Sequence, residues 1–163
     1  MDELFTPVGV AWSRVSPRLA LVRRATITVA ALVVAGGLLT GAAAGAFGRG
    51  LLVVGLVVLA ALLGTGWWVV GRGVQRWGYA ELAEELLITR GALSRRLVVV
   101  PYGRMQYVDV QSGPVDQLTG IATVRLHTAS PGTTAVIPGL PAEEAARLRD
   151  RLTARGESQA SGL

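Results

Sequence analysis

The sequence contains no cysteine and no lysine, and it has a single histidine. Without cysteine the chain can form no disulfide, and it offers no thiolate nucleophile or thiolate metal ligand. Its sixteen basic residues are all arginine, and with eleven acidic residues they give a net charge of +5. This balance suits an anionic membrane surface. The arginines are scattered and no nucleic-acid-binding motif accompanies them, so we expect no nucleic-acid partner.

Charged residues are also missing from two long segments, 25–48 and 50–71, which Arg24, Arg49 and Arg72 delimit. Hydrophobic residues make up 51% of the chain and the mean hydropathy is +0.47, values too apolar for an ordinary soluble domain. Each segment exceeds the roughly 20 residues needed to cross about 30 Å of hydrocarbon. The sequence therefore predicts a transmembrane helical hairpin over residues 25–71, with spans at about 25–46 and 51–70.

The arginines beside the two spans are unevenly distributed. Arg49 is the one arginine in the hairpin turn, whereas six lie near the opposite ends of the spans. These six are Arg14, Arg18, Arg23, Arg24, Arg72 and Arg76. Because positive charge concentrates on the cytoplasmic side, we expect a multi-pass protein of the cell membrane with both termini in the cytoplasm.

Aromatic residues cluster where the second span would leave the bilayer, as in the aromatic belt of membrane proteins. The predicted membrane-interface anchors are Trp12, Trp67, Trp68, Trp77 and Tyr79. Trp12 lies in the segment 1–24, which precedes the first span and in which Pro17 is placed to start a helix. This segment is either an interfacial stretch lying on the membrane or a simple positively charged flank.

Ionisable side chains are absent from the interior of both spans, whose polar side chains are four threonines. Transport pathways and proton relays normally need ionisable groups at that depth, so we do not expect the hairpin alone to be a transporter. Small residues recur every four positions, which favours close helix packing. They are Gly37, Gly41 and Gly45 on the first span and Ala60 and Gly64 on the second. These faces either pack the two helices on each other or contact another membrane subunit.

After Tyr79 the sequence changes to short β-type runs separated by glycine and proline. Predicted strands cover 86–89, 97–100, 104–111, 122–128 and 134–137, with a helical turn at 115–119. A helix is predicted from Pro141, because Glu143 and Glu144 suit its first turn. Its apolar face comprises Ala145, Leu148 and Leu152. We therefore predict an α+β cytoplasmic domain over 79–155, closed by a C-terminal helix, and a disordered tail over 156–163.

Several segments along the chain carry a resemblance. They are Trp12-x-x-Val15-x-Pro17, Glu84-Glu85-Leu-Leu-Ile88-Thr-x-Gly91, Val100-Pro101-Tyr-x-Arg104-Met-Gln106-x-Val108, Gly113-Pro114, Leu126-x-Thr128-Ala-Ser130 and Ile137-Pro138-Gly139-Leu140. Together they resemble the bacterial pleckstrin-homology (PH) membrane proteins of the YdbS type, over nearly the whole chain. The resemblance implies a PH-like fold, a curved antiparallel sheet or half-barrel closed by the C-terminal helix. Gln117 departs from the pattern, since a basic residue is expected there.

The resemblance also implies a kind of function. Members of this family look like binding or assembly modules, so the expected partners are membrane lipids and another PH-domain membrane protein or a second copy of this chain. No catalytic residues belong to the family pattern, and we expect no cofactor. The chain is thus predicted to be a non-enzymatic membrane protein that presents a PH-like binding module at the cytoplasmic face. The alternative is an accessory subunit of a membrane transport or export complex.

Arg90, Arg95 and Arg96 are the candidate lipid- or anion-contacting residues, because they flank or fill the first predicted hairpin turn. PH folds outside bacteria often bind anionic headgroups near this turn. An arginine guanidinium is well shaped for bidentate contact with phosphate. The turn either touches anionic lipid or is a solvated turn with positive-inside character.

The remaining candidates do not form a catalytic or metal site. His127 is predicted to lie on the polar face of the 122–128 strand, and one histidine without cysteine makes a poor metal centre. Asp109 and Asp116 could act as an acid–base pair only if the fold brought them together, and turn chemistry already accounts for Asp116.

Overall fold

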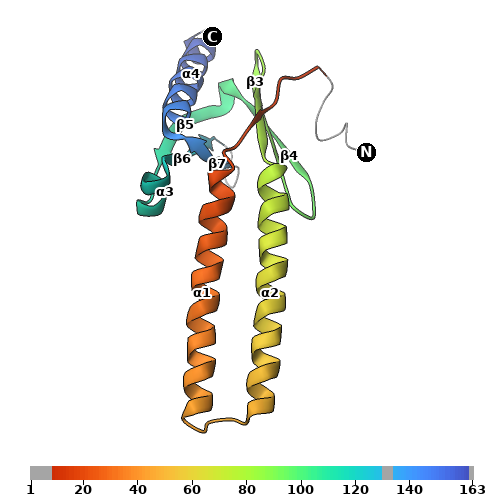
Figure 1. Ribbon diagram of the computed structural model, residues 1–163. Coiled ribbons are helices and arrows are strands. Elements are labelled where there is room, and N and C mark those ends of the chain that lie inside the picture. Colours follow the sequence, from red (N-terminus) through yellow and green to blue (C-terminus); the bar gives the residue numbers. More distant parts are fainter. Residues whose placement is uncertain (1–8, 130–133, 162–163) are drawn as a thin grey trace.

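The computed structural model describes residues 9–129 and 134–161. Two long antiparallel helices, α1 (Arg18–Ala43) and α2 (Arg49–Gln75), carry a β-rich head at one end (Figure 1). Both helices are long and apolar enough to cross a membrane, and the most apolar part of each helix is not buried inside the protein. Contact of such exposed leucine and valine side chains with lipid is favourable, whereas their exposure to water is not. The hairpin has the form expected of two membrane spans.

The hairpin turn begins earlier than the sequence predicts. α1 ends at Ala43, so residues 44–46, which we assigned to the first span, belong to the turn. Gly45 has φ of +75°, a left-handed conformation that commonly ends helices. The Ala46 N–H donates to the carbonyl of Gly41 at 2.9 Å, which satisfies a carbonyl group of the last turn. Gly45 is therefore a turn residue and does not belong to a helix-packing face.

The head contains two antiparallel sheets. The first has the order β1 (Ser13–Arg14), β2 (Gly78–Glu81), β3 (Glu85–Arg90), β4 (Arg96–Pro101). The second has the order β5 (Met105–Gln111), β6 (Ile121–Thr128), β7 (Ala135–Pro141). A short 3-10 helix, η2 (Tyr102–Arg104), leads from one sheet to the other, and α3 (Pro114–Thr119) connects β5 to β6. Each predicted strand corresponds to one of β3 to β7, and the predicted helical turn is α3.

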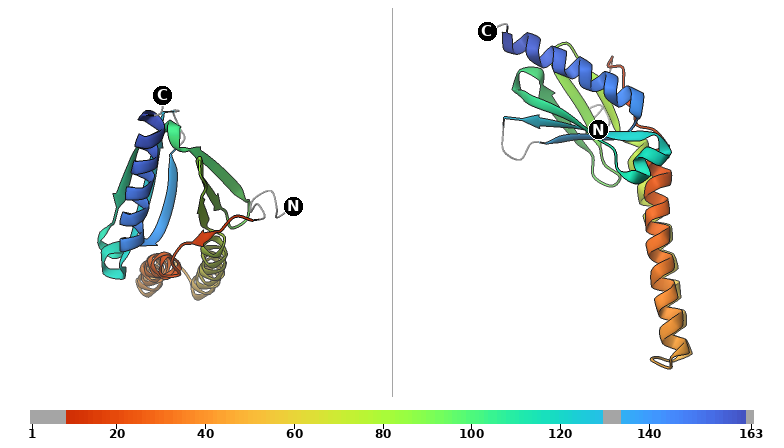
Figure 2. Two further views of the ribbon diagram at one scale, coloured as in Figure 1. Left: turned by 90° about the horizontal axis from the view of Figure 1, so that it is seen from above. Right: turned by 90° about the vertical axis from the view of Figure 1, so that its left-hand side faces the viewer.

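The C-terminal helix α4 (Ala142–Ser161) lies along the β5–β7 sheet and closes the head (Figure 2). Ala145, Leu148 and Leu152, the predicted apolar face, are fully buried. They join a core that includes Tyr102 and Ile121, both also sealed from solvent. Each fully buried leucine contributes about 1.5–3 kcal/mol through removal of its apolar surface from water. The predicted PH-like architecture, antiparallel sheets closed by one helix, is confirmed.

The N-terminal segment is part of the head, which neither of its predicted interpretations included. β1 pairs with β2, so that Ser13 lies opposite Tyr79 and Arg14 opposite Gly78. Val15 and Leu19 are buried in the core, and the Ser16 N–H donates to the carbonyl of Gly139 in β7 at 2.9 Å. α1 therefore starts inside the domain at Arg18. The described part of this segment is thus packed into the head and is not a loose charged flank.

The predicted disordered tail is also corrected over most of its length. α4 continues to Ser161, and residues 162–163 lie outside the described part of the chain. The side-chain amide of Gln159 donates to the Glu84 carboxylate at 2.8 Å, which attaches the last turns of α4 to the β2–β3 connection. A Cβ on Gly156 would lie 3.7 Å from Met105 Cε, so the helix passes close to β5 here.

Candidate membrane-facing site

The turn between β3 and β4 lies beside the end of α2. β2 leads the chain away from α2 and β3 returns, so residues 91–95 reach back along the helix (Figure 1). Arg76 Nη1 donates to the carbonyl of Ala92 at 2.8 Å, and a Cβ on Gly73 would be 3.4 Å from Ala92 Cβ. The turn itself depends on Gly91, which has φ of +130° and whose added Cβ would collide with the carbonyl of Ser94. This turn is thus fixed next to the point where α2 ends.

Three arginines from three separate elements line a groove of about 280 Å³ beside this turn. Arg14 comes from β1, Arg76 follows the last residue of α2, and Arg95 belongs to the β3–β4 turn. The other lining residues are Trp12, Gln75, Trp77, Gly78 and Thr89. No carboxylate lines the groove among the described residues. Guanidinium groups that line one hollow create a positive potential there, which favours a bound anion.

The structure separates the three arginines that the sequence grouped together. Arg95 lines the groove, whereas Arg90 and Arg96 are cross-strand partners in β3 and β4. Arg90 and Arg96 line a second hollow of about 400 Å³ together with Arg104 and β4. Arg90 also lies over the Trp77 ring, with its guanidinium carbon 5.8 Å from the ring centroid. An anion-contacting role for each of the three stays a prediction.

Sequence reasoning missed Arg14 and Arg76 as groove residues. Both were counted only as positive charges next to a membrane span. Arg14 reaches the groove because β1 pairs with β2, which follows β1 in the sequence only after both helices of the hairpin. A two-residue strand with so distant a partner leaves no periodic pattern in the sequence, so no local signal pointed to it.

Trp67 and Trp68 form the aromatic pair near the end of α2 that the sequence predicts, and both are exposed. Arg24 of α1 lies over the Trp67 ring at 5.4 Å, and Trp67 Nε1 donates to Thr28 Oγ1 at 3.1 Å. Gly71 leaves room for this arginine, because a Cβ there would collide with Arg24 Nη2. These contacts join α1 to α2 at the level where tryptophan and arginine side chains favour the bilayer interface.

Two of the five predicted anchors are instead integrated into the head. Tyr79 is 3% exposed and lies in β2, so it is a core residue and not a membrane-interface anchor. Trp77 is half-buried against the core, although one side of it lines the groove. Both positions follow from the start of β2 at Gly78, which turns the chain into the sheet directly after α2. Trp12 lines the same groove.

The predicted glycine faces do not hold α1 against α2. A Cβ on Gly37 or Gly64 would meet nothing within 4 Å, and one on Gly41 would meet the Phe47 ring of the hairpin turn. The close approaches are made by Gly55 to Leu38 and by Gly66 to Ile27, each at 3.3 Å from the added Cβ. Gly55 and Gly66 are about three helical turns apart and so share a face.

Ala60 lines a shallow apolar hollow between the two helices.

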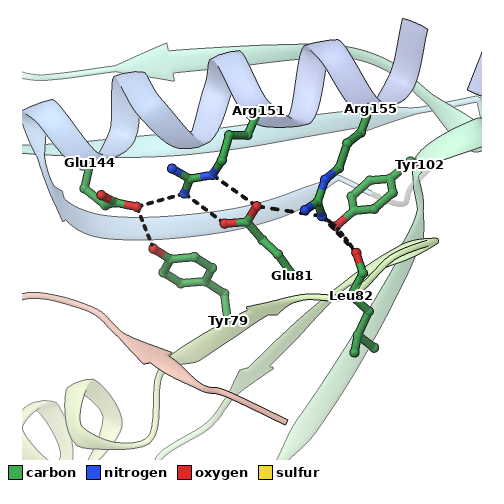
Figure 3. A network of polar contacts seen from close by, with 7 residues as sticks. All are labelled: Tyr79, Glu81, Leu82, Tyr102, Glu144, Arg151 and Arg155. Carbon is green, nitrogen blue, oxygen red and sulfur yellow. Dashed lines mark hydrogen bonds and ion pairs between the residues drawn. The ribbon is translucent and has the colours of Figure 1, made fainter. Parts of the chain in front are cut away.

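A polar network joins α4 to β2 in the head (Figure 3). Arg151 donates to both carboxylate oxygens of Glu81, at 2.8 and 3.1 Å, and to Glu144 at 2.9 Å. The hydrogen bonds that Arg151 donates, to Glu81 first and then to Glu144, raise the pKa of Arg151 above its ordinary value. The Tyr79 hydroxyl donates to the same Glu144 oxygen at 3.4 Å. The bidentate Arg151–Glu81 pair fixes the position of α4.

The second half of the network surrounds η2. The Tyr102 hydroxyl donates to the carbonyl of Leu82 at 3.0 Å and accepts a hydrogen bond from Arg155 Nη1 at 2.7 Å. Arg155 also lies over the Tyr102 ring at 5.2 Å. Every polar group of Tyr102 is therefore paired although the residue is fully buried. The network is structural, since its members are all occupied in holding elements together.

Burial, as the main cause, raises the pKa of both Tyr79 and Tyr102 above the ordinary value of 10.0. Below about pH 10 these tyrosines are protonated in the folded and unfolded chains alike, so their contribution to stability is fully present. Above that pH the unfolded chain loses protons first, and the free energy of unfolding falls. We expect the Tyr79→Phe variant to lose less stability between pH 9 and about 11 than the wild type. Urea unfolding at each pH measures this difference. An equal decrease in the free energy of unfolding with pH in the two proteins would contradict the expectation.

The residues weighed as a metal or acid–base site are not brought together. The His127 ring stacks on Tyr107 at 4.2 Å between centroids. Asp109 accepts a hydrogen bond from the Gln111 side chain, and Asp116 accepts one from the Gly113 N–H at the start of α3. No group of three histidine, aspartate or glutamate side chains that could hold a metal occurs in the described ranges.

Comparison with known proteins defines the class to which this chain belongs. Residues 14–156 match the model of the Bacterial PH domain family, so the chain is a member of that family. The UPF0699 transmembrane protein YdbS of Bacillus subtilis (strain 168) is 39% identical to it over 77 residues, which are 47% of this chain and 47% of YdbS. The match thus spans about half the length of this relative. The chain is a YdbS-like transmembrane protein with a PH-like domain, as the sequence predicted, and neither named family is an enzyme family.

A crystal structure of a DUF1696 family protein with a pleckstrin-homology domain, from Shewanella loihica PV-4, is also similar. The alignment covers 51% of this chain and 73% of the other, with a TM-score of 0.41 and 13% sequence identity.

Proposed function

We propose that this protein is a non-enzymatic, multi-pass module of the cell membrane that binds anionic lipid headgroups in the groove lined by Arg14, Arg76 and Arg95. The uneven distribution of arginines favours a cytoplasmic head and cytoplasmic termini. The cytoplasmic leaflet carries a negative surface potential that attracts basic side chains next to a span. Lipid, and not a dissolved substrate, is then the nearest source of anions.

The position of the groove directly after the apolar run of α2 is the observation that supports this proposal. Arg72 is the first charged residue after the apolar run of α2, and Arg76 lies about one turn, roughly 6 Å, further along. The headgroup region extends roughly 5–8 Å beyond the hydrocarbon on each side. The three guanidinium groups are therefore expected at headgroup level, where a phosphodiester can accept bidentate hydrogen bonds.

Loss of a groove arginine is expected to reduce the preference for anionic lipid. Arg14→Gln and Arg95→Gln should each lower the retention of phosphatidylglycerol over phosphatidylcholine about fivefold, because a basic side chain near a charged surface contributes about 1 kcal/mol. Additive effects would give about 25-fold for the double variant. The measurement is native mass spectrometry of the full-length protein released from nanodiscs of mixed composition.

Arg147→Gln is the matched control, since it removes the same charge from an exposed position on α4, away from the groove. Its lipid preference should equal that of the wild type. If Arg147→Gln lowered phosphatidylglycerol retention as much as Arg14→Gln does, net charge alone would explain the effect and the groove proposal would be wrong.

A second candidate function is assembly with another membrane protein, as an accessory subunit of a membrane transport or export complex. The observation that favours it is the open surface at Gly36, Gly37 and Gly64, where an added Cβ would meet nothing within 4 Å. Glycine faces of this kind allow close approach of another helix, for example from another PH-domain protein or a second copy. Purification from the host in mild detergent separates the candidates, because a stoichiometric protein partner favours assembly and retained anionic lipid alone favours the groove.

A further inference from the structure

The two most exposed large apolar side chains of the head lie in two short segments. Among the described residues outside α1 and α2, the exposed large hydrophobic side chains are Leu93, Val99, Tyr107, Val115 and Leu118. Leu93 is 77% exposed and Leu118 is 88% exposed, more than any other residue of this group. Leu93 belongs to the β3–β4 turn, and Val115 and Leu118 belong to α3. Exposure of so much leucine surface to water is unfavourable, so burial of these two side chains in an apolar environment would be favoured.

These segments lie on opposite sides of the helical hairpin. The β3–β4 turn packs against the end of α2 through Ala92 and Gly73, as described above. α3 packs beside the start of α1, where Arg18 Nη1 donates to the carbonyl of Thr119 at 3.1 Å. Figure 1 shows both segments reaching from the head down along the helices, α3 next to α1 and the β3–β4 turn next to α2.

The apolar surface of α3 continues that of α1. Leu118 and Leu21 line the same shallow hollow, together with Arg18. Leu21 is 64% exposed and precedes the uncharged run of α1 by about one helical turn. On the other side, Ala92, which directly precedes Leu93, lies beside Gly73, just after the apolar run of α2. Both leucines are therefore expected close to the boundary between headgroups and acyl chains, if α1 and α2 span the bilayer over their uncharged runs.

We propose that Leu93 and the Val115–Leu118 face of α3 insert into the cytoplasmic leaflet on either side of the hairpin, so that the head contacts the bilayer at two apolar points. Transfer of these side chains from water into the interface is favourable because apolar surface is buried. Basic side chains stand next to each point, Arg95 near Leu93 and Arg18 near Leu118, as in other interfacial segments. The inference depends on the head lying at the membrane, as in the proposed function, but not on headgroup binding in the groove.

The absence of cysteine allows a direct test with single-cysteine variants of the full-length protein. The cysteine of Leu93→Cys or Leu118→Cys is labelled with the fluorophore NBD, and the protein is placed in nanodiscs. These nanodiscs contain lipid with a spin label near the top of the acyl chain, which quenches NBD that lies close to it. Tyr107→Cys is the control, because Tyr107 is also an exposed hydrophobic residue but lies in β5. Val115→Cys provides a second position on α3 in case labelling at Leu118 disturbs the helix.

We expect about a twofold or greater loss of NBD fluorescence at positions 93 and 118, since interfacial side chains lie roughly 5–10 Å into the headgroup–acyl boundary, and no loss at position 107. Quenching should persist in nanodiscs of phosphatidylcholine alone and in the Arg14→Gln background. Those two conditions distinguish apolar insertion from headgroup binding. Fluorescence at positions 93, 115 and 118 as high as at position 107 would overturn the proposal, and so would quenching on one side of the hairpin only.

Discussion

Replacement of Gly139 by alanine is expected to lower the free energy of unfolding of the head by about 3 kcal/mol. Gly139 has φ of +69°, and this left-handed conformation costs an alanine roughly 1–2 kcal/mol. The added Cβ would also lie 2.6 Å from Leu19 Cβ, which is attached directly to the backbone of α1. Relief of the clash requires α1 to move away from β7, and such overpacking adds roughly 1–3 kcal/mol. Urea unfolding of the full-length protein in micelles, followed by tryptophan fluorescence, measures the loss.

Gly120→Ala is the matched control for this clash. Gly120 has nearly the same φ, +68°, but its added Cβ would meet only Arg18 Nη1 at 3.3 Å. That atom is the end of a flexible side chain and can move, so the expected loss is about 1 kcal/mol, from backbone strain alone. Equal losses in the two variants would show that α1 does not rest on β7 as described.

Truncation of Tyr102 to alanine is expected to destabilise the head by about 4 kcal/mol, since loss of a buried aromatic ring costs roughly 3–5 kcal/mol. Tyr102 is fully buried at the corner where η2 joins the two sheets. Its removal leaves a cavity beneath α4 and takes away the hydroxyl that pairs with Leu82 and Arg155. The same urea unfolding experiment measures this loss.

Two further variants separate the ring of Tyr102 from its hydroxyl. Tyr102→Phe keeps the ring and removes the hydrogen bonds, so a loss of about 1–1.5 kcal/mol is expected. Tyr107→Ala truncates a tyrosine that is 57% exposed and stacked on His127, and we expect less than about 1.5 kcal/mol from it. If Tyr102→Ala were no more destabilising than Tyr107→Ala, packing of Tyr102 at the corner between the two sheets would not stabilise the head as described.

Features with a local pattern were predictable from the sequence. The two uncharged runs specified α1 and α2, because only a helix satisfies its own backbone in hydrocarbon. The alternation of Ala122, Val124 and Leu126 with polar residues specified β6, whose apolar members are buried. The spacing of Leu148 and Leu152 specified the face of α4 that closes the head.

Features that depend on distant pairing were not predictable. β1 has two residues and pairs with β2, from which the two helices of the hairpin separate it in the sequence. Neither this strand nor the groove that Arg14 lines therefore has a local sequence pattern. Glycine spacing did not identify the residues that pack α1 on α2, because four-residue repeats also occur on surfaces open to lipid or to other helices. The end of α4 was predicted as a tail from Gly156 onward, but contacts of this region with Met105 and Glu84 support the helix there.

The most direct test of the proposed headgroup site is photo-crosslinking of the full-length protein in nanodiscs that contain phosphatidylglycerol with a diazirine on its headgroup. Peptide mapping by mass spectrometry then identifies the labelled residues. We expect adducts on Trp12, on Arg76 and Trp77, and on the β3–β4 turn, all reduced in the Arg14→Gln variant. Adducts confined to the α1–α2 hairpin, or centred on Arg90, Arg96 and Arg104, would contradict the proposal that the groove holds the headgroup.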